Sequence, residues 1–202
     1  TEFLPISSTA HLKAIPTLLG MHDPGVSITA VIQLGSIFAV ITYFKKDFQK
    51  IIHGISLAYI AGQWKEPNAR LGFAIALGTI PIVLAGMTIK VFWTNFGDSA
   101  LRSIPSMGAI SIVMAIALGI AEKQKQKFKT IKNVSGKDGL YIGLAQMFAL
   151  IPGVSRSGIT LTASMMNGWN RADAARFSFL LGIPAITIAG LVEFKNTFHP
   201  FE

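Results

Sequence analysis

The chain has 202 residues, of which 51% are hydrophobic and only 14% are charged. A soluble domain carries about 25% charged residues, so this composition excludes an ordinary soluble protein and indicates a polytopic α-helical membrane protein. The lack of cysteine excludes disulfides and thiolate metal sites. The formal net charge of +8 suggests nucleic-acid binding at first sight, but basic cytoplasmic loops of a membrane protein explain it better. We therefore expect no nucleic-acid partner.

The chain opens on Thr1–His11, a polar segment with a carboxylate and an imidazole. Because His11 follows Ser8 by three residues, a helix that begins at Ser7 or Ser8 stacks these side chains on one face. A hydroxyl beside an imidazole suits a nucleophile with its base, or an acid that protonates a leaving group. Glu2 is a hard oxygen ligand suited to Mg²⁺ or Ca²⁺. The candidate hydroxyls of this segment belong to Ser7, Ser8 and Thr9.

Four apolar stretches qualify, or nearly qualify, as membrane spans, for which about 20 residues suffice. Between the first two, Ile51–Gly62 is apolar but short. This segment is either an interfacial helix or the start of a hairpin that lies in the membrane surface. The four predicted spans are Val26–Phe44, Leu71–Trp93, Ile104–Ala121 and Ala174–Phe194.

Lys and Arg gather in two of the connecting loops, whereas the loop Thr94–Ser103 carries only Arg102. The positive-inside rule places the two basic loops in the cytoplasm and Thr94–Ser103 outside. Binding of anionic lipid or nucleic acid is the alternative use of the basic run. The basic residues are Lys45, Lys46, Lys50, Lys65 and Arg70 in the first loop, and Lys123, Lys125, Lys127, Lys129, Lys132 and Lys137 in the second.

The segment Pro152–Thr160 sets a guanidinium and several hydroxyls beside long apolar stretches. An arginine inside a membrane domain is energetically expensive, so it usually has a function. Glycine lets backbone N–H groups approach an anion, hydroxyls donate hydrogen bonds, and Arg156 matches phosphate oxygens as a fork. The segment therefore predicts a phosphate clamp. Its candidate substrate-binding residues, beside Ser7 and Thr9 of the first segment, are Gly153, Ser155, Ser157, Gly158 and Thr160.

A weak internal repeat relates the two polar segments. Three predicted spans lie between equivalent points of the two halves, and an odd number gives the halves opposite orientations, as in an inverted-topology repeat. We expect a single membrane domain over residues 1–202, with a first half of about 1–93, a second half of about 139–202 and a cytoplasmic basic loop at 122–138. The matching pairs, at one constant offset, are Pro5 with Pro152, Ser8 with Ser155, Leu34 with Leu181 and Gly35 with Gly182.

Each polar segment has apolar flanks too short to cross a bilayer and is broken by proline. We therefore expect Thr1–Leu12 and Tyr141–Thr160 to form re-entrant helix–loop–helix segments that enter from opposite faces and meet near the midplane. Together they supply the parts of a phosphoryl-transfer site: Glu2 for a metal, Ser8 as nucleophile, His11 for proton transfer and Arg156 as cationic stabiliser.

Each of these residues also has a structural interpretation. The hydroxyls of Ser7–Thr9 and the carboxylate of Glu2 suit helix caps, and His11 suits an interfacial histidine bonded to the backbone. Arg156 suits a snorkelling cytoplasmic anchor. Gln146, in an apolar stretch, suits either support of the site or a hydrogen bond between helices. The coincidence of two polar clusters at equivalent points of a repeat favours the functional interpretation.

Three motifs, Thr1–His11, Ile32–Ile37 and Pro152–Thr160, resemble those of the undecaprenyl-diphosphate phosphatase family of bacteria, also called bacitracin-resistance proteins. The resemblance runs across the whole chain, including the spacing of the motifs. It implies a multi-pass enzyme of the bacterial inner membrane that hydrolyses undecaprenyl diphosphate to undecaprenyl phosphate and inorganic phosphate. The product is a carrier lipid that returns to peptidoglycan synthesis, and bacitracin competes for the same substrate.

Within this resemblance, Glu2 corresponds to the second carboxylate of the family's acidic motif, Ser8 to the proposed nucleophile and His11 to the proton-transfer histidine. Ser155 and Arg156 match the essential pair of the second motif. An activated water is the rival of Ser8 as nucleophile. The family places a first acidic or amide residue four positions before the equivalent of Glu2, which is ahead of the start of this chain. We therefore interpret the sequence as a fragment that lacks both ends.

A lipid transporter or flippase is the alternative function, because inverted repeats with broken helices are common in transporters. A structural membrane scaffold ranks third, since it gives no reason for Arg156 among hydroxyls. A second copy of the chain, in a homodimer, is a further candidate partner.

Overall fold

The computed structural model describes residues 4–21, 25–93, 99–124 and 128–198, without the side chains of residues 9, 25–31, 33–34 and 193–198. Within these ranges the regular structure is helical, apart from one isolated β-bridge between Lys129 and Trp169. The predicted all-α class is confirmed. The α-helices are α1 (Ser8–Leu18), α2 (Gly25–Tyr43), α3 (Lys45–Ala61), α4 (Pro67–Phe92), α5 (Ile104–Glu122), α6 (Gly136–Gln146), α7 (Arg156–Met166) and α8 (Arg171–Phe198), and the short 3₁₀ turns are η2 (Ala100–Arg102), η3 (Ile131–Asn133) and η4 (Met147–Leu150).

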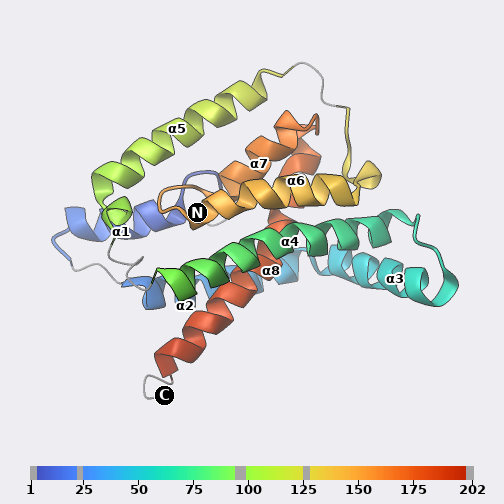
Figure 1. Ribbon diagram of the computed structural model, residues 1–202, viewed down its shortest axis with the longest axis horizontal. Helices are drawn as coiled ribbons and strands as arrows, with labels where there is room; N and C mark the ends of the chain where they lie inside the picture. Colours follow the sequence, from blue (N-terminus) through green and yellow to red (C-terminus); the bar gives the residue numbers. More distant parts are fainter. Residues whose placement is uncertain (1–3, 22–24, 94–98, 125–127, 199–202) are drawn as a thin grey trace.

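The four predicted spans coincide with α2, α4, α5 and α8 (Figure 1). Among the described residues, α4, α5 and the stretch Arg171–Val192 of α8 are long and apolar enough to cross a membrane. Two spans begin earlier than their apolar stretches because polar residues cap them. The Glu66 carboxylate accepts a hydrogen bond from Ala69 N–H at 2.7 Å, and the Asn170 amide oxygen accepts one from Asp173 N–H at 3.0 Å.

The short apolar segment Ile51–Gly62 forms most of α3, which ends at Gly62 in the left-handed conformation with φ 68°. α3 folds back on α4 as the first arm of a helical hairpin. A Cβ atom added to Gly54 would lie 2.7 Å from the backbone nitrogen of Ala69, so glycine allows the tight approach. Of the two alternatives raised by the sequence, the hairpin is therefore the one that describes how α3 packs.

Helices α4 and α6 approach each other so closely that their backbones touch. A Cβ atom on Gly143 would lie 2.5 Å from Gly78 Cα, and one on Gly139 would lie 2.7 Å from Ala74 Cα. Both helices thus present small residues four positions apart, the pattern that allows close packing of helices in membranes. This contact fixes α6 on α4 and so fixes the origin of the loop that follows α6.

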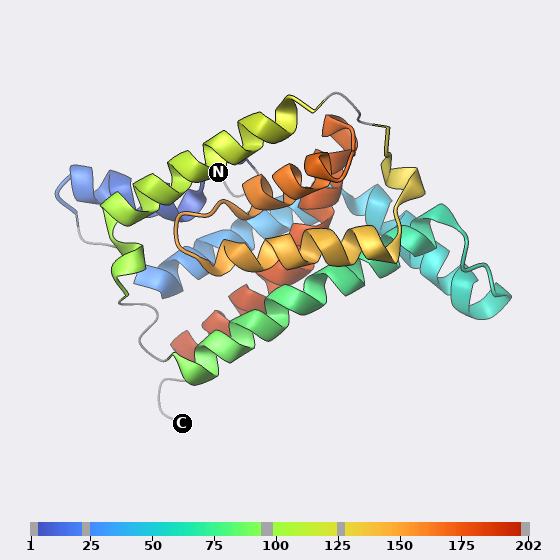
Figure 2. The ribbon, with the colours of Figure 1, turned by 45° about the horizontal axis from the view of Figure 1, so that its top comes forward.

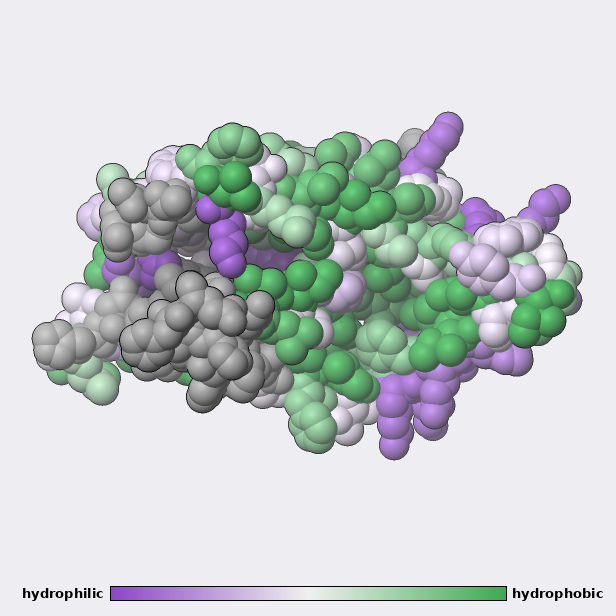
Figure 3. Space-filling model, turned by 60° about the horizontal axis from the view of Figure 1, so that its bottom comes forward, coloured by the Kyte–Doolittle hydropathy of each residue, from purple (hydrophilic) through white to green (hydrophobic). Residues whose placement is uncertain are grey.

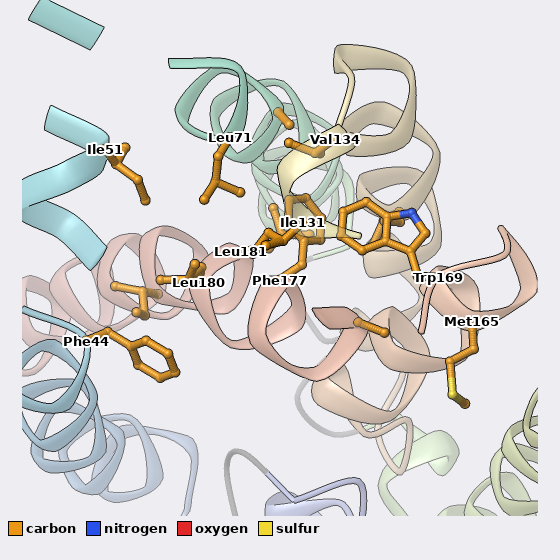
Figure 4. Packing of buried hydrophobic residues seen from close by; sticks show 14 of the residues in the cluster. Phe44, Ile51, Leu71, Ile131, Val134, Met165, Trp169, Phe177, Leu180 and Leu181 are labelled. Atoms are coloured by element: carbon orange, nitrogen blue, oxygen red, sulfur yellow. The ribbon is translucent and has the colours of Figure 1, made fainter. Parts of the chain in front are cut away.

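The core joins elements distant in sequence (Figure 4). Trp169 and Phe177 are fully buried and their ring centroids lie 5.1 Å apart. Ile131 and Val134 from the segment before α6 and Leu181 from α8 belong to the same cluster. Burial of such large apolar side chains holds the connection between α7 and α8 against the segment that leads into α6.

The two predicted cytoplasmic loops lie at the same end of the molecule (Figures 1 and 2). Ion pairs join the elements there: Arg171 at the start of α8 to Glu122 at the end of α5 at 3.2 Å, and Arg176 to Asp47 of α3. Figure 3 shows hydrophilic residues gathered at this end, with hydrophobic residues over the middle of the molecule. The two loops therefore share one side, as the predicted topology requires.

The segment from α6 through η4 to α7 is a helical hairpin whose two outer ends are tied together. Asp138, in the first turn of α6, accepts hydrogen bonds from Lys129 Nζ at 2.8 Å and from Asn167 Nδ2, just after α7, at 2.6 Å. Ser135 caps α6 and its hydroxyl also bonds the Asp138 carboxylate. α6 therefore starts, and α7 ends, at the side of the basic loops.

This network predicts a pH-dependent stability. Burial alone raises the pKa of Asp138, but the hydrogen bonds from Lys129, Ser135 and Asn167 outweigh burial and leave the pKa below its ordinary value of 3.8. The carboxylate therefore stabilises the fold above about pH 4, and this contribution is lost as the pH falls through the lowered folded pKa. We expect Asp138→Asn to reduce the free energy of unfolding by about 1–3 kcal/mol at pH 7, with a shrinking difference below pH 4.

Thermal unfolding of both proteins in detergent at pH 7 and pH 3 measures this effect. An equal difference between wild type and Asp138→Asn at the two pH values would contradict the role given to the Asp138 charge.

Candidate functional site

The two polar segments predicted from the sequence are Thr1–Leu12, here called loop one, and Tyr141–Thr160, here called loop two. They touch each other in the structure. Ser157 Oγ, in the first turn of α7, donates a hydrogen bond of 2.9 Å to the carbonyl oxygen of Leu4. Pro5 packs beside Gly158, where an added Cβ atom would lie 3.5 Å from Pro5 Cβ. The segment that leads into α1 is thus joined to the start of α7, although 153 residues separate Leu4 from Ser157.

This junction brings together the starts of two helices, each of 11 residues. The first turns of α1 and α7 contain no acidic residue. The N-terminus of a helix carries unpaired N–H groups and a partial positive charge, so it favours anions. Arg156, the first residue of α7, adds a full positive charge. The junction is therefore suited to a phosphate group.

Loop two is held in shape by contacts that only glycine permits. Gly153 has φ 96°, and a Cβ atom there would lie 2.9 Å from the Cα and carbonyl oxygen of Met107 in α5. The Ser111 hydroxyl, also from α5, donates a 3.2 Å hydrogen bond to the Gly153 carbonyl oxygen. Gly153 thus seats the loop on α5, and its contact with substrate stays a prediction.

The hydroxyls predicted to bind substrate are engaged within the protein. Ser155 caps α7, its Oγ accepting from Gly158 N–H at 3.2 Å, and it lies 3.3 Å from Ser157 Oγ. Thr160 is fully buried, donates to the Arg156 carbonyl oxygen at 2.8 Å and bonds the hydroxyl of Ser178 in α8. These groups order the start of α7 and tie it to loop one and α8. Contact of the same hydroxyls with substrate stays a prediction.

Arg156 is half-buried, and its guanidinium donates a long hydrogen bond of 3.4 Å to the Gly182 carbonyl oxygen of α8. It begins α7, whereas the basic end of the molecule lies at the other end of that helix, beside Asn167. A helix of 11 residues is about 16 Å long, so Arg156 lies far from that end. This position argues against the interpretation of Arg156 as a cytoplasmic snorkelling anchor.

In loop one, Ser7 and Ser8 are buried, and Ser7 has the unusual φ of 52° for a residue other than glycine. His11 is exposed, and its Nδ1 lies 2.9 Å from the Ser7 carbonyl oxygen. A carbonyl oxygen only accepts, so Nδ1 carries the proton in this bond and Nε2 is the basic nitrogen of the neutral ring. The expected pairing of His11 with the Ser8 hydroxyl does not occur among the hydrogen bonds of the described residues.

Two predicted site residues cannot be placed. Glu2 lies outside the described residues, as does the side chain of Thr9. In the part of the chain that the structure describes, no three His, Asp or Glu side chains lie close enough to hold a metal ion. The hydroxyl and backbone oxygens of the junction alone are weak ligands for Mg²⁺ or Ca²⁺, which prefer carboxylates. A metal site would therefore depend on Glu2, and it stays a prediction.

The structure adds residues that sequence reasoning missed or left open. Ser178 bonds Thr160 and the Ser157 carbonyl oxygen, and the signal for it was a polar residue inside an apolar span. Gln146, at the end of α6, is fully buried, and neither its amide nitrogen nor its oxygen has a hydrogen-bond partner. Two roles were predicted for Gln146: support of the site, or a hydrogen bond between helices. Its amide bonds no other helix, so only support of the site stays a prediction.

Comparison with known proteins places these features in context. A family model described as Bacitracin resistance protein BacA matches residues 1–201. Undecaprenyl-diphosphatase of Prochlorococcus marinus (strain MIT 9303) is 64% identical over 198 residues, which cover 98% of this chain and 68% of that protein. Undecaprenyl-diphosphatase of Synechococcus sp. (strain CC9311) is 63% identical over 198 residues, covering 98% of this chain and 70% of the relative.

Proposed function

Because this chain belongs to the bacitracin resistance protein BacA family, we propose that it hydrolyses undecaprenyl diphosphate to undecaprenyl phosphate and inorganic phosphate. The reaction regenerates the lipid carrier for cell-wall synthesis, and bacitracin, which competes for this substrate, explains the family's link to resistance. The observation that carries the proposal is the junction of the two loops, where two helix starts and Arg156 form a site for an anion.

The chemistry follows from the charges that change during hydrolysis. The anhydride bond between the terminal phosphorus and the bridging oxygen breaks, and an attacking oxygen bonds the phosphorus. Arg156 and the N–H groups at the start of α7 stabilise the negative charge on the phosphoryl oxygens. His11 moves a proton through Nε2, toward the leaving oxygen or from an attacking water. The attacking oxygen is that of a water molecule or of Ser8. In the second case the Ser8 hydroxyl loses its proton and becomes a phosphoserine, and water then hydrolyses the phosphoserine to release inorganic phosphate.

A divalent cation, Mg²⁺ or Ca²⁺, is part of the proposal, with Glu2 as its protein ligand. When bound, it would neutralise charge on the diphosphate oxygens. The remaining predicted residues, Ser7, Thr9, Ser155, Ser157 and Thr160, would shape or line the diphosphate pocket, together with Gly153 and Gly158.

We place the enzyme in the bacterial inner membrane as a multi-pass protein with an inverted repeat. Support comes from the hairpin of α6 and α7, whose outer ends share one side, and from α1, where Lys13 Nζ donates to the Arg102 carbonyl oxygen in the loop between α4 and α5. α1 thus ends near the side opposite the basic loops. Loops that enter from the two sides and meet inside the protein fit two re-entrant segments. The predicted homodimer stays a prediction.

The proposed hydrolysis is tested against the lipid-transport alternative with Ser8→Ala and His11→Ala. A transporter needs neither a nucleophile nor a proton donor, so both variants should still move lipid. A hydrolase needs a proton donor and, if Ser8 attacks, that hydroxyl, so at least one variant should lose activity. We expect His11→Ala to lower phosphate release by about 10²-fold or more, the usual contribution of a positioned acid or base, with lipid binding retained. If the Ser8 hydroxyl is the nucleophile, Ser8→Ala should lower phosphate release by a comparable factor. If water attacks, the loss in Ser8→Ala should be smaller.

Movement of lipid across the bilayer is measured separately, in vesicles that contain the protein and a fluorescent prenyl phosphate. If both variants release phosphate at the wild-type rate, the roles given to Ser8 and His11 are wrong. If the wild type moves lipid across the bilayer without releasing phosphate, the protein is a lipid transporter and the proposed hydrolysis is wrong.

A further inference from the structure

An apolar groove lies directly beside the proposed diphosphate site. It has a volume of about 420 Å³, within the range of about 300–1,000 Å³ that small-molecule sites occupy. Helix α5 forms one wall, and the loop before α7 together with α7 itself forms the other. No polar surface contributes to its lining, which includes Ala109, Val113, Met114, Phe148, Val154 and Ile159.

The groove is continuous with the polar junction along the chain. Val154 immediately precedes Ser155, and Ile159 immediately follows Gly158, so the polar run Ser155–Gly158 is bracketed by two groove residues. The Ile159 N–H donates to the Ser155 carbonyl oxygen at 2.8 Å, which fixes the two ends of this run in one helical turn. A molecule with its charged end at the polar run would meet apolar groove residues at both ends of that run.

The groove opens to the outside of the protein along α5. Only 11% of the α5 span is buried, compared with 50% for α8, and Figures 1 and 2 show α5 at the edge of the helical assembly. The groove residues Val113 and Phe148 are 63% and 57% exposed. A long chain bound there would therefore extend into the surrounding lipid without having to fit wholly inside the protein.

We propose that this groove binds the isoprenoid segment next to the diphosphate of the substrate. The inference rests on the proposed function and adds to it the side chains that recognise the lipid. A fully apolar lining offers a hydrocarbon chain close contacts and offers water no hydrogen bond. The polar junction holds the diphosphate, and α5 with Val154 and Ile159 holds the first isoprene units.

A groove-filling substitution with a matched control tests the proposal. Val113 lines the groove, and its neighbour Ile112 is equally exposed at 63% on the same helix but does not line it. We expect Val113→Trp to raise the KM for undecaprenyl diphosphate by about tenfold with kcat within about threefold, because a few apolar groups in a pocket are worth that much. We expect Ile112→Trp to stay within about twofold of wild type. Equal KM values for the two variants would overturn the proposal.

A second measurement on the unaltered protein does not depend on how the variants fold. A prenyl diphosphate with a diazirine on an isoprene unit near the diphosphate is photoactivated, and the labelled peptides are identified by mass spectrometry. We expect labels on α5 and on residues 148–159, and we expect excess undecaprenyl diphosphate to suppress them. Labels outside these segments would contradict the proposal. So would labels that excess substrate does not suppress, because these would report nonspecific contact with bilayer lipid.

The two inferences fail in different ways. If the proposed function is wrong, wild type releases no phosphate from undecaprenyl diphosphate. If only the groove inference is wrong, wild type releases phosphate normally, while Val113→Trp and Ile112→Trp share one KM and the photolabel falls outside the groove.

Discussion

Arg156→Ala is expected to lower the kcat for phosphate release from undecaprenyl diphosphate by about 10²–10³-fold or more. Removal of one group that stabilises a developing oxyanion has a cost of this order in other enzymes. Arg156 begins α7 at the junction of the two loops and lies about one helix length away from the basic end of the molecule. An arginine that is half-buried within a membrane domain is energetically expensive and usually has a function.

Two further variants sharpen this prediction. Arg156→Lys keeps the charge but loses the planar fork, so it should restore only part of the activity. Arg171→Ala removes an exposed arginine that pairs with Glu122 at the basic end, and it should leave kcat within about twofold of wild type. Wild-type turnover in Arg156→Ala, measured on protein with an unchanged melting temperature, would remove Arg156 from the mechanism.

Gly143→Ala is expected to cause a large loss of stability, because the added methyl group would meet the backbone of the facing helix. The added Cβ atom would lie 2.5 Å from Gly78 Cα and 2.7 Å from the Gly78 carbonyl carbon. Both are backbone atoms, which cannot rotate away as a side chain does, so α4 and α6 must separate. Overpacking of this kind costs about 1–3 kcal/mol and sometimes more. Thermal unfolding in detergent should show a clear fall in melting temperature.

Gly86→Ala, on α4, is the matched control for that experiment. The nearest atom to an added Cβ at Gly86 is a flexible leucine methyl, Cδ2 of Leu150, at 3.9 Å. Because alanine also has the higher helix propensity, Gly86→Ala should leave the melting temperature unchanged or raise it. If Gly143→Ala and Gly86→Ala unfold at the same temperature, the close contact between α4 and α6 does not carry the stability assigned to it.

The sequence predicted where the helices lie along the chain better than it predicted which helices pack against each other. Apolar length located α2, α4, α5 and α8, because a helix that is apolar over about 20 residues has few other structures open to it. The starts of α4 and α8 were predicted a few residues too late, because the polar caps Glu66 and Asn170 extend these helices beyond their apolar stretches. The tight pair Gly78 and Gly143 was not recognised, since glycine four positions from another small residue is frequent in apolar sequences and gains meaning only from the facing helix.

The sequence predicted a contact between the two polar segments, but not the hydrogen bonds within it. The bond from Ser157 to Leu4 joins the two loops, and α1 starts at Ser8, one of the two positions expected for it. The hydrogen bonds within the site could not be predicted, because they depend on tertiary contacts. Thr160 bonds Ser178 of α8, and His11 bonds the Ser7 backbone in place of the Ser8 hydroxyl. Spacing along one helix cannot reveal a partner on another.

The most direct test of the account is the release of inorganic phosphate from undecaprenyl diphosphate by the purified protein in detergent. Wild type and Arg156→Ala are compared with Mg²⁺, with Ca²⁺ and with a chelator. We expect metal-dependent release by wild type that Arg156→Ala reduces by at least about 10²-fold. Absence of release from well-folded wild-type protein in every condition would contradict the hydrolase and leave lipid transport as the function to test.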